Sequence, residues 1–148
     1  MGFFPTDVGA QLKAVPVGAG TATAGGTGDA TKVTGQAIDR QDFLSGVLAI
    51  AFKATLAKDK TISFAVEVQE SADGSNFGTA VAVQAAKVAA TGGESGSTEY
   101  GVVKIDENLK GRKRHVRYNI TPDLSATGTD TLVWGAAFVL GGAVVKPA

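Results

Sequence analysis

Apolar residues occupy every second position in two long stretches near the middle of the chain. A period of two residues is typical of antiparallel strands that bury one face. The short polar segment KDK lies between the stretches, which predicts that residues 47–70 form one long hairpin. The residues of the two apolar rows are Leu48, Ile50, Phe52, Ala54 and Leu56, and Ile62, Phe64, Val66 and Val68.

Shorter stretches separated by turns continue this pattern toward the C-terminus. Residues 79–90 contain both alanine, which favours a helix, and valine, which favours a strand, and the adjacent turns lead us to predict a strand. The segment DENLKG predicts a single helical turn, because Asp106 can cap its start and Gly111 follows its end. Residues 131–140 alternate again, with Trp134 and Phe138 on the same face.

Roughly seven or more short strands at this spacing predict an all-β fold, either an antiparallel β-sandwich or a jelly roll. Residues 1–19 lack the alternation and contain two prolines, so we interpret them as an extended N-terminal arm. Residues 20–144 then form the sandwich domain, and residues 145–148 form a C-terminal tail. The predicted core includes Phe64, Val66, Trp134 and Phe138.

The apolar residues of the arm are candidates for binding a partner. The arm is too short and too interrupted by proline to form a core of its own. Exposed apolar residues of this kind usually face another molecule. The candidate partner-binding residues are Phe3, Phe4, Leu12, Val15 and Val17.

Composition narrows the possible functions. The 148 residues include 14 basic and 14 acidic ones, a balance that argues against a dedicated nucleic-acid coat protein. The chain has no cysteine, which excludes disulfides and thiol catalysis, and its single histidine cannot form an HExxH zinc motif. No stretch approaches the roughly 18 apolar residues of a membrane span. We therefore expect no enzyme activity, no catalytic residue, no cofactor, no metal site and no membrane partner.

The stretch GRKRHVRYNIT, residues 111–121, concentrates basic residues around the single histidine and raises the possibility of nucleic-acid binding. If it is a strand, Val116, Tyr118 and Ile120 face the core. The outward row has no aromatic side chain on which a base could stack. We therefore interpret the basic stretch as a solvated or protein-facing strand without a specific nucleic-acid partner, and keep nucleic-acid binding through residues 112–117 as the less favoured alternative. The outward row is Lys113, His115, Arg117, Asn119 and Thr121.

Three segments carry a resemblance to a known family: ATAGGTGDATKVTGQAIDR, VQESADGSNFGTAVAV and LKGRKRHVRYNITPDLSATGTDTLVWGAAFVLGGA. Together they resemble small virion structural proteins of tailed bacteriophages, over about residues 20–144. The resemblance implies a head decoration (cement) protein that is assembled in the host cytoplasm. It implies that the protein binds the major capsid protein and copies of itself, as a homotrimer on the head surface of the virion.

Two other functions remain open from the sequence. One is a structural protein associated with the neck or tail of the particle. The other is a carbohydrate-binding module used for adhesion to the host. Such a module would require an exposed tryptophan or tyrosine in a loop, whereas the only tryptophan, Trp134, lies on the predicted core face.

Overall fold

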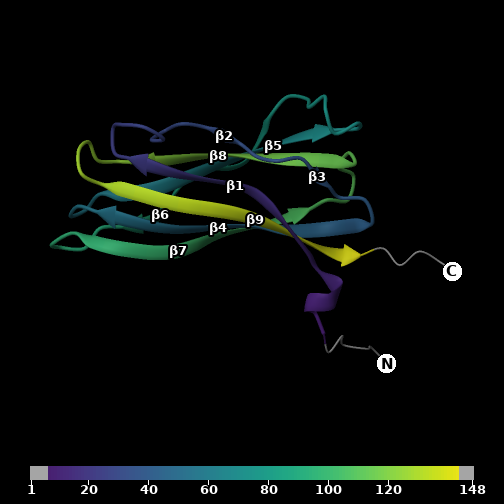
Figure 1. The fold of residues 1–148 in the computed structure, drawn as a ribbon, viewed down its shortest axis with the longest axis horizontal. Helices are drawn as coiled ribbons and strands as arrows, with labels where there is room; N and C mark the ends of the chain where they lie inside the picture. Colours follow the sequence, from purple (N-terminus) through teal and green to yellow (C-terminus); the bar gives the residue numbers. More distant parts are fainter. Residues whose placement is uncertain (1–6, 144–148) are drawn as a thin grey trace.

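A computed structural model describes residues 7–143 as two antiparallel sheets packed face to face (Figure 1). This arrangement confirms the predicted all-β sandwich. Sheet A has the strand order β1-β9-β4-β7, and sheet B has the order β2-β8-β5-β6, with β3 also paired to β8. The strands of sheet A are β1 (Lys13–Thr23), β4 (Phe43–Leu56), β7 (Ser97–Asn108) and β9 (Thr131–Ala143). Those of sheet B are β2 (Val33–Thr34), β3 (Ile38–Asp39), β5 (Thr61–Ser71), β6 (Val81–Thr91) and β8 (His115–Leu124).

The strands β4 and β5 do not form the predicted hairpin. The strand β4 pairs with β7 and β9 in sheet A, whereas β5 pairs with β6 and β8 in sheet B. The segment between them therefore crosses from one sheet to the other. The prediction was wrong because alternation defines the face that a strand buries but not the strand beside it. The two apolar rows face each other across the core and are not neighbours in one sheet.

The inner faces of the two sheets form one continuous core. Phe64 and Val66 of β5 and Trp134 and Phe138 of β9 are all buried, as predicted. The Phe64 ring lies edge-on to the Trp134 ring, with 6.3 Å between their centroids. Gly46 of β4 leaves room for the Phe138 ring, since a β-carbon at this position would overlap it. Contact between large rings from opposite sheets is what fixes the separation of the layers.

Two further segments test the predicted elements. Residues 79–90 form most of β6, which confirms the strand. The segment DENLKG does not form a helical turn over its whole length, because β7 continues through Asp106 to Asn108. Glu107 and Leu109 are buried there. Alternate burial of these side chains keeps the chain extended and overrides the local capping signal.

The sandwich begins earlier in the chain than predicted. Ten residue pairs join β1 to β9, from Lys13 opposite Leu140 to Thr23 opposite Thr131. Residues 13–19, predicted to belong to the arm, are thus part of sheet A. Within the described residues, the segment that precedes the sandwich is residues 7–12, which contains the short 3-10 helix η1 (Gly9–Gln11). The predicted tail, residues 145–148, lies outside the described residues.

We expect Trp134→Ala to lower the free energy of unfolding by about 3–5 kcal/mol, because it removes a large ring from the interface between the sheets. Val133→Ala, at the exposed neighbouring position of β9, should change it by less than about 0.5 kcal/mol. Denaturant unfolding of both variants measures the difference. Equal stability of the two variants would contradict the assigned inner face of β9.

Candidate interaction surfaces

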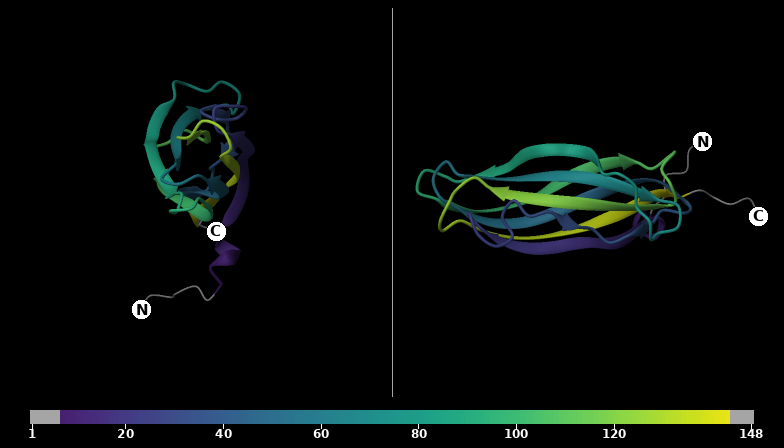
Figure 2. Two further views of the ribbon diagram at one scale, coloured as in Figure 1. Left: turned by 90° about the vertical axis from the view of Figure 1, so that its left-hand side faces the viewer. Right: turned by 90° about the horizontal axis from the view of Figure 1, so that it is seen from above.

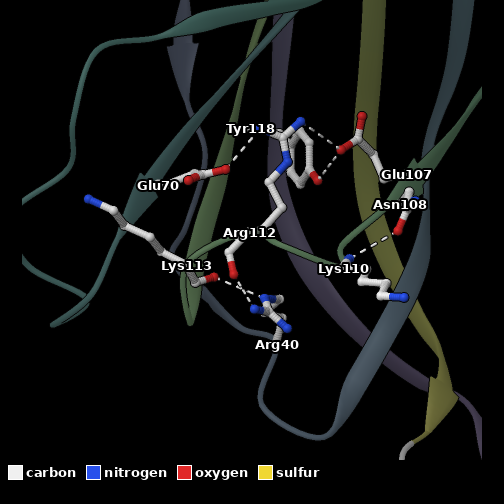
Figure 3. Close-up of polar contacts among 8 residues, drawn as sticks. All are labelled: Arg40, Glu70, Glu107, Asn108, Lys110, Arg112, Lys113 and Tyr118. Atoms are coloured by element: carbon white, nitrogen blue, oxygen red, sulfur yellow. Dashed lines mark hydrogen bonds and ion pairs between the residues drawn. The ribbon is translucent and has the colours of Figure 1, made fainter.

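The basic stretch starts in the turn after β7 and continues into β8, where it closes one end of the core (Figure 3). Arg112 points toward Glu70 of β5 and Glu107 of β7, with a 2.9 Å ion pair from Nη1 to Glu70 Oε1 and a 3.6 Å contact from Nη2 to Glu107 Oε2. Tyr118 of β8 donates a 3.1 Å hydrogen bond to the same Glu107 oxygen. One guanidinium group therefore joins β5, β7 and the start of β8.

Burial and charge explain the protonation of this network. Burial of the Tyr118 hydroxyl, and then the nearby Glu107 carboxylate, raise the pKa of Tyr118, so this side chain stays a neutral donor. The hydrogen bond to Glu70 raises the pKa of Arg112, so the guanidinium stays charged. A buried carboxylate is stable only with such partners. Arg112 is therefore used to neutralise Glu70 and Glu107 within the protein, and it is not available to bind the phosphates of a nucleic acid.

The other basic side chains near the turn also bind within the protein. Arg40 donates hydrogen bonds to the main-chain oxygens of Arg112 and Lys113, which fixes the turn (Figure 3). Arg114 forms a two-pronged contact with Asp39 of β3, and its Nη2 lies 2.7 Å from Asp39 Oδ2. The hydrogen bonds from Arg114 lower the pKa of Asp39 to about 2.

Arg117 lies against sheet B. Its Nε donates to Gln69 Oε1 at 2.9 Å, and its guanidinium lies 4.1 Å from the centroid of the Phe77 ring. Asn119 donates to the same Gln69 oxygen and is buried, although we predicted it to be on an exposed row. Asn119 does lie on the predicted face of β8. The side chains of the neighbouring strands cover it, because β8 lies inside sheet B.

Of the four basic side chains at residues 112–117, which all lie in the described part of the chain, only that of Lys113 has no bonding partner there. The His115 ring packs on Gly74, and its buried Nδ1 has no hydrogen-bond partner among the described residues. Three of the four cations thus hold the end of the sandwich together. The arrangement favours a structural role for the basic stretch over a nucleic-acid interface.

The structure does not bring the five candidate partner-binding residues together. Phe3 and Phe4 lie outside the described residues. Leu12 is exposed, as expected for docking, and Val15 packs partly against the core. Val17 is only 1% exposed and belongs to the core, so its assignment to partner binding is corrected. Its neighbour Pro16 lies at a break in the pairing of β1 with β9, so the proline could be tolerated without ending the strand.

The outward face of sheet A is the surface that the sequence analysis missed. Its rows contain Val47, Ala49 and Ala51 of β4, and the pattern continues on β9 with Val133, Ala137 and Val139. The outward row of β7 is mixed and ends in Lys104, Asp106 and Asn108. Three side chains of this face are highly exposed: Tyr100 at 73%, Val102 at 64% and Val133 at 55%. The central strands of sheet B instead carry Glu67, Gln69 and Arg117 outward, and the exposed large apolar residues of that sheet, Val81 and Val88, lie on its edge strand β6. The sequence of β4 did indicate this surface, because residues 47–52 are apolar on both faces of the strand. A solvated antiparallel sheet normally has a polar outer row.

Other kinds of site lack support within the described residues. Among residues 7–143, no three His, Asp or Glu side chains lie together so that they could hold a metal ion. No helix in that range is long and apolar enough to cross a membrane.

Comparisons with known proteins identify the fold class. No family model and no curated protein matches the sequence. A structure of the infectious bursal disease virus Gx strain matches with a TM-score of 0.50 and 10% identity, over 92% of this chain and 34% of that chain. The VP2 subviral particle of the same virus matches with a TM-score of 0.49 and 7% identity, over 87% of this chain and 32% of that chain.

The chain therefore has a β-sandwich fold of the class found in viral capsid proteins. It spans about one third of the length of the virus chains that it matches, at 34% for the Gx strain. Identity this low establishes a shared fold only.

We expect Arg112→Met to lower the free energy of unfolding by about 1–3 kcal/mol, because Glu107 would remain buried without a cation. Lys113→Met is the matched control, since its side chain has no bonding partner in the described part of the chain and should change stability by less than about 0.5 kcal/mol. Chemical denaturation measures both. An Arg112→Met protein as stable as the control would show that the network does not hold this end of the core.

The Asp39–Arg114 pair predicts a dependence of stability on pH. The pKa of Asp39 is about 2 in the folded protein, compared with an ordinary aspartate value of 3.8, so its ionised form favours folding. This contribution is complete above about pH 4 and is lost as the pH falls through 2. Asp39→Asn should therefore be less stable than the parent protein at pH 6, and the difference should shrink toward zero as the pH falls below 2, as measured by unfolding at each pH. The difference should be small, because the pair is exposed to solvent.

Proposed function

We propose that this chain is a structural protein of a virion, and more narrowly a head decoration (cement) protein of a tailed bacteriophage. The observation that carries the proposal is the contrast between the two outward faces of the sandwich. The central strands of sheet A, β4 and β9, present mostly small apolar side chains outward, whereas the central strands of sheet B, β5 and β8, present polar side chains that bind one another. A protein that covers a shell has a face for the shell and a face for water.

The shared fold and the resemblance to phage virion proteins support the same proposal. A flat sheet of alanine, valine and glycine can approach another protein closely, because few long side chains stand between them. The partners in this proposal are the major capsid protein and other copies of this chain, assembled as a homotrimer on the head surface. A position at the neck or tail would use the same surfaces, and an inventory of purified particles by mass and copy number separates the two positions.

The alternative of a carbohydrate-binding adhesion module has less support. Trp134 and Tyr118 are buried within the core. Among the described tyrosines and tryptophan, only Tyr100 is exposed, and it lies within β7 on the flat face of sheet A. A ring on the face of a sheet suits contact with a protein surface. A sugar-binding site would instead place the ring in a loop.

We expect Ala51→Glu to abolish binding to undecorated phage heads, because it places a charge at the centre of the apolar face of sheet A. Ala86→Glu is the matched control, since it makes the same change at an exposed position of β6 in sheet B. The measurements are the number of copies bound per head and the resistance of the head to heat. Absence of binding by the parent protein would refute the decoration role, and equal binding by both variants would refute the assigned face.

A truncation tests the arm in the same assay. Removal of residues 1–19 would also remove Val17 and the rest of residues 13–19 of β1, so it would damage the sandwich. Removal of residues 1–6 leaves every described residue in place. We expect the shorter deletion to preserve folding and to reduce the number of copies bound per head.

A further inference from the structure

The outward face of sheet A contains a hollow of about 650 Å³ at the end where the chain enters the sandwich. Its floor crosses three strands in two rows. In the first row, Val139 lies opposite Val47, which lies opposite Asp106. In the second row, Gly141 lies opposite Ser45, which lies opposite Asn108. Leu12 forms one wall, and we call the whole feature the Leu12 hollow.

The small residues of the second row give the hollow its depth. A β-carbon at Gly141 would lie 3.2 Å from the Leu12 side chain, so glycine allows Leu12 to lie low over the sheet. Gly142 has a φ of 62°, which glycine adopts without strain, and a β-carbon there would lie 2.9 Å from the Ser45 hydroxyl. Larger residues in this row would fill the space. The glycines of β9 thus create a recess in an otherwise flat sheet.

The chemistry of the Leu12 hollow suits an apolar side chain. Leu12, Val47 and Val139 supply the apolar surface. The two charged residues that line the hollow are already paired, since Asp106 lies 2.9 Å from the Lys104 ammonium and Glu107 lies 3.6 Å from the Arg112 guanidinium. The recess has room for an aromatic ring, and burying such a ring removes about 150–250 Å² of surface from water, more than a small aliphatic side chain can.

We infer that the Leu12 hollow binds the Phe3–Phe4 segment of a neighbouring copy of this chain, an inference that rests on the proposed role in assembly. Residues 1–6 can extend about 20 Å beyond Asp7. Residues 7–12 are all exposed, and η1 lies on the side of sheet A, clear of the body of the sandwich (Figures 1 and 2). The chain thus leaves the body of its own sandwich at η1, and each copy supplies one segment and one hollow, so that identical copies can repeat the contact.

A disulfide experiment tests this inference, because the chain has no cysteine. Thr6→Cys places a thiol next to the two phenylalanines and leaves both in place. Asn108→Cys places a second thiol at the rim of the Leu12 hollow, at an exposed position of β7. The two single-cysteine proteins are mixed under oxidising conditions. A disulfide requires α-carbons within about 7 Å, so a covalent heterodimer reports the docked segment.

Two controls separate docking from random collision. Thr98→Cys replaces Asn108→Cys at another exposed position of the outward row of β7, about 34 Å along the strand at 3.4 Å per residue. A Thr6→Cys protein that also carries Phe3→Ser and Phe4→Ser lacks the rings. We expect the heterodimer with Asn108→Cys, and its loss in both controls.

Each other outcome overturns the inference. A doubly substituted Thr6→Cys/Asn108→Cys chain that closes a disulfide within itself, with no heterodimer in the mixture, would show that the segment binds its own hollow. A heterodimer from Val145→Cys and Asn108→Cys, but none from Thr6→Cys, would assign the hollow to the C-terminal tail. No disulfide in any mixture would refute the docking even if the parent protein still binds heads, so the failure of this inference is distinguishable from failure of the decoration role.

Discussion

The stacking of Tyr118 on Phe138 is the contact on which the rest of the structure depends. The two rings come from opposite sheets and lie 5.0 Å apart at an interplanar angle of 12°. This contact fixes which face of β8 is turned inward. A shift of β8 by one residue would reverse every side chain and bury Arg117 in place of Tyr118. Once Tyr118 is inside, its hydroxyl needs a partner, and Glu107 supplies one at the cost of a buried carboxylate, which Arg112 neutralises.

The basic stretch follows from this constraint. A buried carboxylate in β7 and a half-buried one in β5 require a cation at the end of the sandwich, and the turn before β8 is the segment that reaches both. Arg114 and Arg117 then bind groups on either side of β8. A cluster that resembles a nucleic-acid site in the sequence is therefore accounted for by acidic, amide and aromatic groups from β3, β5 and the loop that carries Phe77.

The sequence alone was enough to predict which face of a strand is buried, but not which strand lies beside it. Alternation in β5 and β9 correctly placed Phe64 and Trp134 in the core, because burial of one face imposes a period of two. It could not place β4 and β5 in different sheets, since pairing depends on contacts far apart in the chain. Two prolines suggested an arm through residue 19, but pairing with β9 makes residues 13–19 a strand. The partners of Arg112 lie 42 and 5 positions away, and no local pattern identifies the more distant one.

The outward face of sheet A and the Leu12 hollow both depend on β9. Its inward residues, Trp134 and Phe138, hold the sheets together, so the strand must pass through the middle of sheet A. Its outward residues are then available for association, and they are small enough to form a flat surface and, at Gly141 and Gly142, a recess. Because β1 pairs antiparallel with β9, the chain enters sheet A beside the end of β9. The same pairing that completes the core therefore places Leu12 beside the recess. Each chain thus carries both the recess and the start of the segment that a ring of identical chains would use.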